Sequence, residues 1–246
     1  MRGCNLRCPY CYNTELVVPQ EASQDLNAGA RRANGQPVFV PIQDIIAHLK
    51  KRANVLSGFA ISGGEPLLQP ELVRRLILEA RSLGYKIKLD TNGMFPDRLQ
   101  KLLDAPAARP DYVALDVKTS PARYGELQVQ DKRIVGSSPT MTNAGGDNRS
   151  QAKEAAQKIV DSIKIVSSLE AEAREFRTVL YPPLVARAEI EEIAALLPKD
   201  ASWFFANFLN GHCLSAAAEN VAPYSDEDTK ALVDLARATI PDAILR

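Results

Sequence analysis

The sequence carries no excess of charge and no long apolar run. Its 246 residues include 30 Lys and Arg against 30 Asp and Glu, so the formal net charge is zero. A nucleic-acid surface needs a clustered basic excess, and a membrane-spanning helix needs ~20 consecutive apolar residues. Neither is visible, and nothing resembling a secretory signal precedes the first cysteine. We therefore expect a soluble, cytoplasmic protein without a nucleic-acid or membrane partner.

Cysteine and histidine are also scarce, with four and two residues. So few cysteines in a composition typical of a cytosolic enzyme disfavour a disulfide framework. Three of the four, Cys4, Cys8 and Cys11, nevertheless fall within the first eleven residues. The spacing C-x3-C-x2-C offers three thiolates on one tight loop, which is the ligand type of iron-sulfur clusters. Three ligands on a four-iron cluster leave one iron open for a cofactor or substrate.

A structural zinc site is the alternative interpretation of these cysteines. Such sites normally close with four Cys or His ligands. Only His48, His212 and Cys213 remain to supply the fourth ligand, and all lie far along the chain. Cys213 stands alone and is typical of a small buried apolar residue.

Length and composition suit one domain, residues 1–246, of the size used by α/β barrels. Short β-rich runs alternate with amphipathic stretches, which predicts βα units and a parallel sheet. Strands are expected at 58–62, 86–90, 112–117, 176–181 and 202–208. Helices are expected at 42–52, 70–83, 97–103, 151–169, 188–197 and 225–238. Polar segments near 20–37 and 135–150 predict loops.

Three polar motifs each follow a predicted strand directly. They are Ser62 to Glu65, Asp90 to Gly93 and Asp116 to Lys118. The carboxyl ends of barrel strands form the catalytic face of α/β barrels. The spacing therefore predicts an active site where these motifs and the cysteine loop meet.

The string Gly3-Cys4-Asn5-Leu6-Arg7-Cys8-Pro9-Tyr10-Cys11 resembles the cluster loop of radical S-adenosylmethionine (SAM) enzymes. Four further strings follow in the order of that family: Ser62-Gly63-Gly64-Glu65-Pro66, Leu89-Asp90-Thr91-Asn92-Gly93, Asp116-Val117-Lys118 and Phe176-Arg177-Thr178-Val179. The likeness covers nearly the whole chain and is greatest to glycyl-radical activating enzymes, especially the anaerobic ribonucleoside-triphosphate reductase activating proteins. It implies an incomplete (β/α)6 barrel, open on one side. The family's first strand would precede Cys4, so that strand is expected to be missing or truncated, leaving an unpaired sheet edge.

The resemblance also implies the cofactors and their ligands. One 4Fe-4S cluster would be held by Cys4, Cys8 and Cys11, because no second cysteine set of the ferredoxin type is present. SAM would chelate the open iron and would contact the backbone of Gly63 and Gly64, which have no side chain to obstruct it. Glu65 would steady this loop or the methionine amine, and Tyr10 would stack on the adenine. Arg177 would touch the methionine carboxylate.

Asp90 and Thr91, with Asp116 and Val117, match positions that in pyruvate formate-lyase activating enzymes help to bind a monovalent cation near that carboxylate. Two carboxylates beside an anionic group require such a cation or a lysine, and Lys118 is placed to be that lysine. The alternative is that Asp90 and Asp116 are solvent-facing strand ends. Two departures from the family are Tyr12, where histidine is frequent, and the absence of a histidine around Asn207 to Leu209.

The function implied is the reductive cleavage of SAM and the formation of a glycyl radical on an anaerobic ribonucleotide reductase. The electron would come from flavodoxin or ferredoxin. Three alternatives stay open: a small-molecule enzyme similar to 7-carboxy-7-deazaguanine synthase, a non-enzymatic metal-binding module, and an inactive relative that lacks the first strand.

Overall fold

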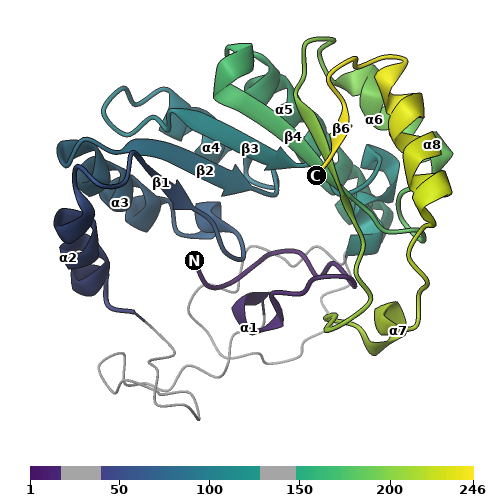
Figure 1. Ribbon diagram of the computed structural model, residues 1–246, viewed down its shortest axis with the longest axis horizontal. Helices are drawn as coiled ribbons and strands as arrows, with labels where there is room; N and C mark the ends of the chain where they lie inside the picture. Colours follow the sequence, from purple (N-terminus) through teal and green to yellow (C-terminus); the bar gives the residue numbers. More distant parts are fainter. Residues whose placement is uncertain (18–39, 128–147) are drawn as a thin grey trace.

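The computed structural model describes residues 1–17, 40–127 and 148–246. Within them, six parallel strands form one sheet in the order β1-β2-β3-β4-β5-β6. The strands are β1 (Gly58–Ile61), β2 (Lys86–Thr91), β3 (Tyr112–Asp116), β4 (Arg174–Leu180), β5 (Trp203–Asn207) and β6 (Ile244–Leu245). β1 and β6 are the two edges, so the sheet is curved but not closed (Figure 1). The predicted α/β class with an open parallel sheet is confirmed.

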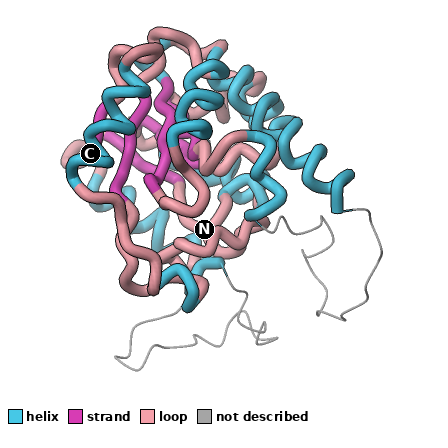
Figure 2. Tube along the Cα trace, turned by 90° about the vertical axis from the view of Figure 1, so that its right-hand side faces the viewer, coloured by secondary structure: helices cyan, strands magenta, loops and turns pink. Residues whose placement is uncertain are grey.

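Helices separate successive strands along the chain. They are α1 (Thr14–Val17), α2 (Ile42–Arg52), α3 (Pro70–Ser82), α4 (Pro96–Leu103), α5 (Asn148–Ser167), α6 (Arg187–Leu196), α7 (Ala216–Glu219) and α8 (Asp226–Arg237). Figures 1 and 2 show helices along the outer side of the curved sheet, with the N-terminal segment facing its other side. The six longer helices match the predicted ones closely. α1 and α7 are single turns, too short to produce a helical periodicity in the sequence.

The sixth strand was not predicted from the sequence. Five strands are predicted, and the family's first strand, before Cys4, is expected to be missing or truncated, whereas the sixth strand of the structure, β6, forms at residues 244 and 245 and pairs with β5. Two residues show no recognisable alternation, which is why the sequence did not reveal β6. Beside β1, the backbone of Met1 and Gly3 accepts hydrogen bonds from Gly64 N (2.9 Å) and Glu65 N (2.8 Å). The first residues therefore pair with the loop after β1, although no described strand pairs with β1 itself on this side.

The core lies between the sheet and its outer helices. Trp203, Phe205 and Phe176 are fully buried, and their burial stabilises the fold by roughly 1.5–3 kcal/mol for each side chain. Val113 and Leu115 of β3 are also fully buried. Residues at alternate positions of a strand share one face, so this core follows directly from the strand pattern.

Two of the predicted features fall largely outside the described residues. The loop predicted near 20–37 lies outside them, as does most of the loop predicted at 135–150. Residues 148–150 are not loop but the first turn of α5. None of the described helices combines the length and apolarity needed to cross a membrane.

Candidate active site

A cavity of about 580 Å³ opens at the carboxyl ends of the strands. Its volume falls in the range of typical cofactor pockets, roughly 300–1,000 Å³. Three of its walls are the cysteine loop, the loop after β1 and the ends of β2, β3 and β4. The fourth wall is β5 with the residues that follow it. The predicted convergence of the cysteine loop and the strand-end motifs is thus what the structure shows.

Hydrogen bonds of its own backbone and of one arginine help to hold the cysteine loop. Cys11 N donates to Cys8 O (3.0 Å), which closes the turn between these two ligand positions. The Arg7 guanidinium donates to the carbonyls of Cys4 (2.8 Å) and Leu6 (3.0 Å). Cys4, Cys8 and Cys11 all line the cavity as free thiols. Across the described part of the chain, no three Cys, His, Asp or Glu side chains are arranged to hold a single metal ion.

Two N–H groups approach the sulfur of Cys4. Leu6 N lies 3.4 Å from Cys4 Sγ, and the Asn92 side-chain amide lies 3.6 Å from it. The same amide donates to Asn5 Oδ1 at 3.0 Å. Burial raises the pKa of the Cys8 thiol to about 12 and also raises that of Cys4. A metal that binds these sulfurs must therefore displace protons.

The glycine pair after β1 permits a close approach of two backbones. Gly63 has φ of +135°, which side chains rarely allow. A Cβ at Gly63 would collide with the backbone of Met1, and one at Gly64 with that of Gly3. Both glycines line the cavity, but the close neighbour that demands glycine is the N-terminal segment. They thus place the cysteine loop beside β1, a role that the sequence interpretation did not include.

Glu65 links the loop after β1 to the end of β2 by hydrogen bonds. Its fully buried carboxylate accepts hydrogen bonds from Leu67 N (2.9 Å), the Thr91 hydroxyl (2.9 Å) and Asn92 N (2.7 Å). Burial raises its pKa to about 7, against the opposing effect of these hydrogen bonds. Neither Glu65 nor Thr91 lines the cavity. Of the two roles expected for Glu65, this geometry fits the steadying of the loop.

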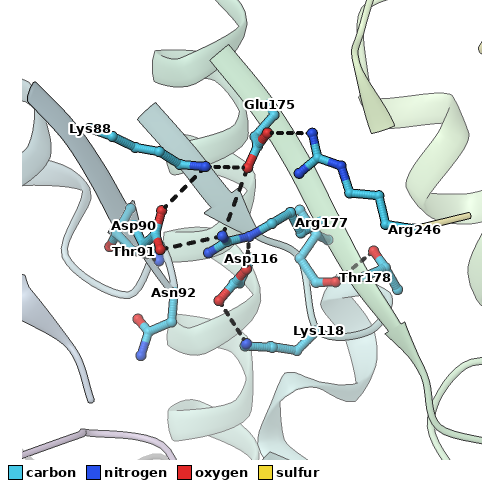
Figure 3. A network of polar contacts seen from close by, with 12 residues as sticks. Lys88, Asp90, Thr91, Asn92, Asp116, Lys118, Glu175, Arg177, Thr178 and Arg246 are labelled. Carbon is cyan, nitrogen blue, oxygen red and sulfur yellow. Dashed lines mark hydrogen bonds and ion pairs between the residues drawn. The ribbon is translucent and has the colours of Figure 1, made fainter. Parts of the chain in front are cut away.

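Charged side chains from three strands form a network on the cavity floor (Figure 3). Arg177 of β4 lies between two carboxylates, with its guanidinium 3.3 Å from Asp90 Oδ2 and 2.6 Å from Asp116 Oδ1. Lys118 Nζ lies 2.9 Å from the other oxygen of Asp116. All four residues line the cavity; Asp90, Asp116 and Lys118 were expected there from the strand ends, and Arg177 from the family resemblance. Arg177 thus places a positive charge between Asp90 and Asp116, two of the residues for which the resemblance implies a monovalent cation nearby.

The network is charged at neutral pH. Burial alone would raise the pKa of Asp116, but Lys118 and Arg177 outweigh it and hold that pKa below its usual value. Conversely, burial would lower the pKa of Lys118, and the neighbouring Asp116 carboxylate raises it instead. The ion pairs therefore persist across the physiological range.

A second group of charges continues the network and was not predicted. Glu175, buried on the same face of β4 as Arg177, accepts from Lys88 (2.8 Å), Tyr112 (3.1 Å) and Arg246 (3.3 Å). The Arg246 guanidinium also lies 3.3 Å from the centre of the Phe204 ring. The sequence offered one signal that Glu175 belongs to the site: it lies two residues before Arg177, and residues two apart share a strand face.

The aromatic residue between the cysteines is buried at the cavity wall. The Tyr10 ring lies 5.0 Å from that of Tyr181, which in turn contacts Phe208 at 4.8 Å. The Tyr10 hydroxyl is buried without a hydrogen-bond partner among the described residues. Tyr12 is instead 70% exposed at the rim.

The remaining Cys and His residues are not part of the cavity lining. Cys213 is buried beside Leu209 O (3.8 Å), His212 contacts the Thr14 hydroxyl (3.4 Å), and His48 is exposed on α2. None of the three lines the cavity. Asn92, Phe204 and Phe208 do line it and were not predicted as site residues.

Comparison with known proteins places this geometry in a wider context. The profile of the radical SAM superfamily matches residues 1–170. The chain is 27% identical over 192 residues, 78% of its length, to a Methanocaldococcus jannaschii protein provisionally named a glycyl-radical enzyme activating enzyme. It is 35% identical over 125 residues, 47% of its length, to the 7-carboxy-7-deazaguanine synthase of Methanopyrus kandleri. These alignments span only 64% and 46% of the two relatives.

A solved structure has a similar fold. A domain of a pyruvate-formate lyase-activating enzyme from Bacteroides vulgatus superposes with a TM-score of 0.54 at 15% identity, covering 78% of this chain and 99% of that domain. At this identity the likeness concerns the fold alone.

Proposed function

Because the chain belongs to the radical SAM superfamily, we propose that it activates an anaerobic ribonucleoside-triphosphate reductase by forming a glycyl radical on it. The family implies a 4Fe-4S cluster and SAM, and the residues present suit both. Three free thiols face one cavity of adequate volume, and charged groups of both signs lie opposite them. When bound, the cluster and SAM would supply a one-electron cleavage of the SAM carbon–sulfur bond, with flavodoxin or ferredoxin as the electron donor. The products would be methionine, 5'-deoxyadenosine and a substrate radical.

The chain's own residues would hold and orient these groups. Cys4, Cys8 and Cys11 would bind three irons and leave the fourth for SAM. Lys118 and Arg177 would attract the methionine carboxylate, while Asp90 and Asp116 keep both cations in place. Phe204 and Phe208 would exclude water from the reacting atoms.

The observation that carries the choice of an activating enzyme is the extent of the alignment. It covers 78% of the chain for the M. jannaschii protein. A small-molecule enzyme similar to 7-carboxy-7-deazaguanine synthase is the second candidate. The higher identity over a shorter stretch, 35% over 125 residues, favours it.

The test is radical formation on the reductase. We would mix anaerobically reconstituted, reduced protein with SAM and an anaerobic ribonucleotide reductase, and record electron paramagnetic resonance spectra together with 5'-deoxyadenosine. The proposal expects a glycyl-radical doublet that grows with 5'-deoxyadenosine, and none on a reductase variant whose radical-bearing glycine is alanine. Cleavage of SAM without this doublet, but with turnover of a free pterin, would support the second candidate instead.

A further inference from the structure

The side-chain amide of Asn92 is held in one orientation. Asn92 directly follows β2, beside the charged network, and is buried (Figure 3). Its Oδ1 accepts a hydrogen bond from Met94 N at 3.0 Å, and its backbone N–H donates to the Glu65 carboxylate at 2.7 Å. A side-chain amide has one acceptor end and one donor end, and a backbone N–H can only donate. The contact with Met94 therefore fixes the direction in which the NH2 group of Asn92 points.

That NH2 group points at the cysteine loop. One of its contacts is Asn5 Oδ1 at 3.0 Å, and the other is Cys4 Sγ at 3.6 Å. Both N–H bonds of the buried amide thus have an acceptor, which is the arrangement that buried polar groups require. The donor that faces Cys4 is held in place from three sides, by Met94, Glu65 and Asn5.

We propose that Asn92 raises the reduction potential of the iron-sulfur cluster by donating a hydrogen bond to the iron-bound sulfur of Cys4. The inference rests on the cluster that the radical SAM family implies, and not on the identity of the substrate. An ionised acceptor forms a stronger hydrogen bond than a neutral one, so the contact with Cys4 gains strength when its thiol becomes a thiolate ligand.

The sign of the effect follows from charge. The reduced cluster carries one more negative charge than the oxidised cluster, and a hydrogen-bond donor stabilises the more negative state more strongly. Hydrogen bonds to the sulfurs are one of the determinants of the potential of such clusters. An external electron donor of fixed potential would therefore reduce a larger fraction of the cluster when Asn92 is present.

A purely structural role of Asn92 is the competing explanation. The contacts with Met94 and Asn5 would serve either role, whereas only the proposed role needs the N–H that faces Cys4. Asn92→Leu removes this donor and puts an apolar side chain of similar length in its place, which limits the entry of water, itself a determinant of the potential. Asn5→Ala is the matched control, because it removes the other acceptor of the same NH2 group and leaves the donor to Cys4.

The test is a redox titration of the anaerobically reconstituted full chain without SAM, followed by electron paramagnetic resonance of the reduced cluster. At a fixed applied potential, the ratio of reduced to oxidised cluster should fall roughly threefold to tenfold in Asn92→Leu, a shift of about 30–60 mV for a one-electron couple. Asn5→Ala should stay close to wild type. Iron and sulfide analysis verifies that the three proteins carry equal amounts of cluster.

Two results of this titration would overturn the proposal. One is an unchanged potential in Asn92→Leu with full iron content. The other is an equal decrease in both variants, because the packing of the loop would then set the potential.

A second measurement leaves the sequence unchanged, so it decides the matter even if Asn92→Leu does not hold the cluster. Protein labelled with 15N in the side-chain amide of asparagine should show a 15N coupling in pulsed electron paramagnetic resonance of the reduced cluster, and Asn5→Ala should keep it. Absence of this coupling would contradict the hydrogen bond. Neither measurement involves a reductase, so a failed activation assay leaves this inference standing, and an unchanged potential leaves the proposed activation standing.

Discussion

At the scale of single residues, the site depends on groups that fasten the cysteine loop as much as on the cysteines. Gly63 and Gly64 let the backbone of Met1 to Gly3 approach β1, and Glu65 ties the same loop to the end of β2. Asn92 joins the two parts, because its backbone N–H binds Glu65 and its side chain reaches Cys4. The position of the three sulfurs is therefore set by residues about 60 and 90 positions away.

The three clustered cysteines should behave differently from the fourth. Replacing Cys4, Cys8 or Cys11 by alanine should abolish cluster retention, because each thiolate binds one iron, whereas wild-type protein should hold about four irons. Cys213→Ala is the control, since Cys213 lies outside the cavity lining. Iron and sulfide analysis after anaerobic reconstitution measures the result. Comparable loss in Cys213→Ala would require a four-ligand site.

Lys118→Ala should keep the cluster and weaken SAM binding. Loss of a charge-assisted contact costs about 1.5–3 kcal/mol, or roughly tenfold to a hundredfold in affinity. Lys164→Ala is the matched control, because its side chain is 71% exposed on α5. Equilibrium dialysis with labelled SAM distinguishes the two variants. Equal affinity of both would assign Lys118 a purely structural role beside Asp116.

The raised pKa of Glu65 predicts that the free energy of unfolding depends on pH. Its pKa in the folded protein is about 7, above the ordinary value of 4.5. Protonated Glu65 therefore contributes its full share to the free energy of unfolding below pH 4.5. This contribution, at most roughly 3 kcal/mol, is lost as pH rises through 7. The melting temperature of wild type relative to Glu65→Gln should fall between pH 5 and pH 8. A constant difference would mean that the three hydrogen bonds keep the carboxylate ionised at pH 5.

At the scale of elements, helix boundaries follow local capping chemistry. Ser225 precedes α8, and its hydroxyl accepts a hydrogen bond from Asp228 N at 3.1 Å. Pro70 occupies the first turn of α3, where its missing N–H needs no partner. These starts were predicted from the sequence because the signals lie within four residues of one another.

Ser225→Ala should destabilise the protein by about 1 kcal/mol through loss of this cap. For a chain of this size the melting temperature should fall by roughly 2–4 °C. Ser215→Ala tests the specificity of the effect, since Ser215 precedes α7 without a capping side-chain hydrogen bond. Differential scanning calorimetry of both variants measures the contrast. A similar shift in both would contradict the capping explanation.

At the scale of the whole molecule, an open sheet and a balanced charge define what can approach the cavity. Among the described residues the sheet ends at β1 on one side and at β6 on the other, so it is not closed. The 30 basic and 30 acidic residues give no net field to steer a charged partner over long distances.

The sequence by itself determined the features that are local along the chain. Cys4, Cys8 and Cys11 lie within eight positions, and strand and helix periods repeat over two to four residues, so no folding information is needed to find them. The carboxyl ends of parallel strands share one edge of a sheet, which is why Asp90, Asp116 and Lys118 could be expected to meet.

Only the tertiary structure decided how distant residues share their charges and hydrogen bonds. Arg177 takes the place between Asp90 and Asp116, Glu65 turns to Thr91 and away from the cavity, and Arg246 joins Glu175. β6 likewise exists because β5 offers it an edge. Each of these side chains and strands could pair with several others of suitable charge or shape. Which pairs form depends on the curvature of the sheet, which no local pattern in the sequence encodes.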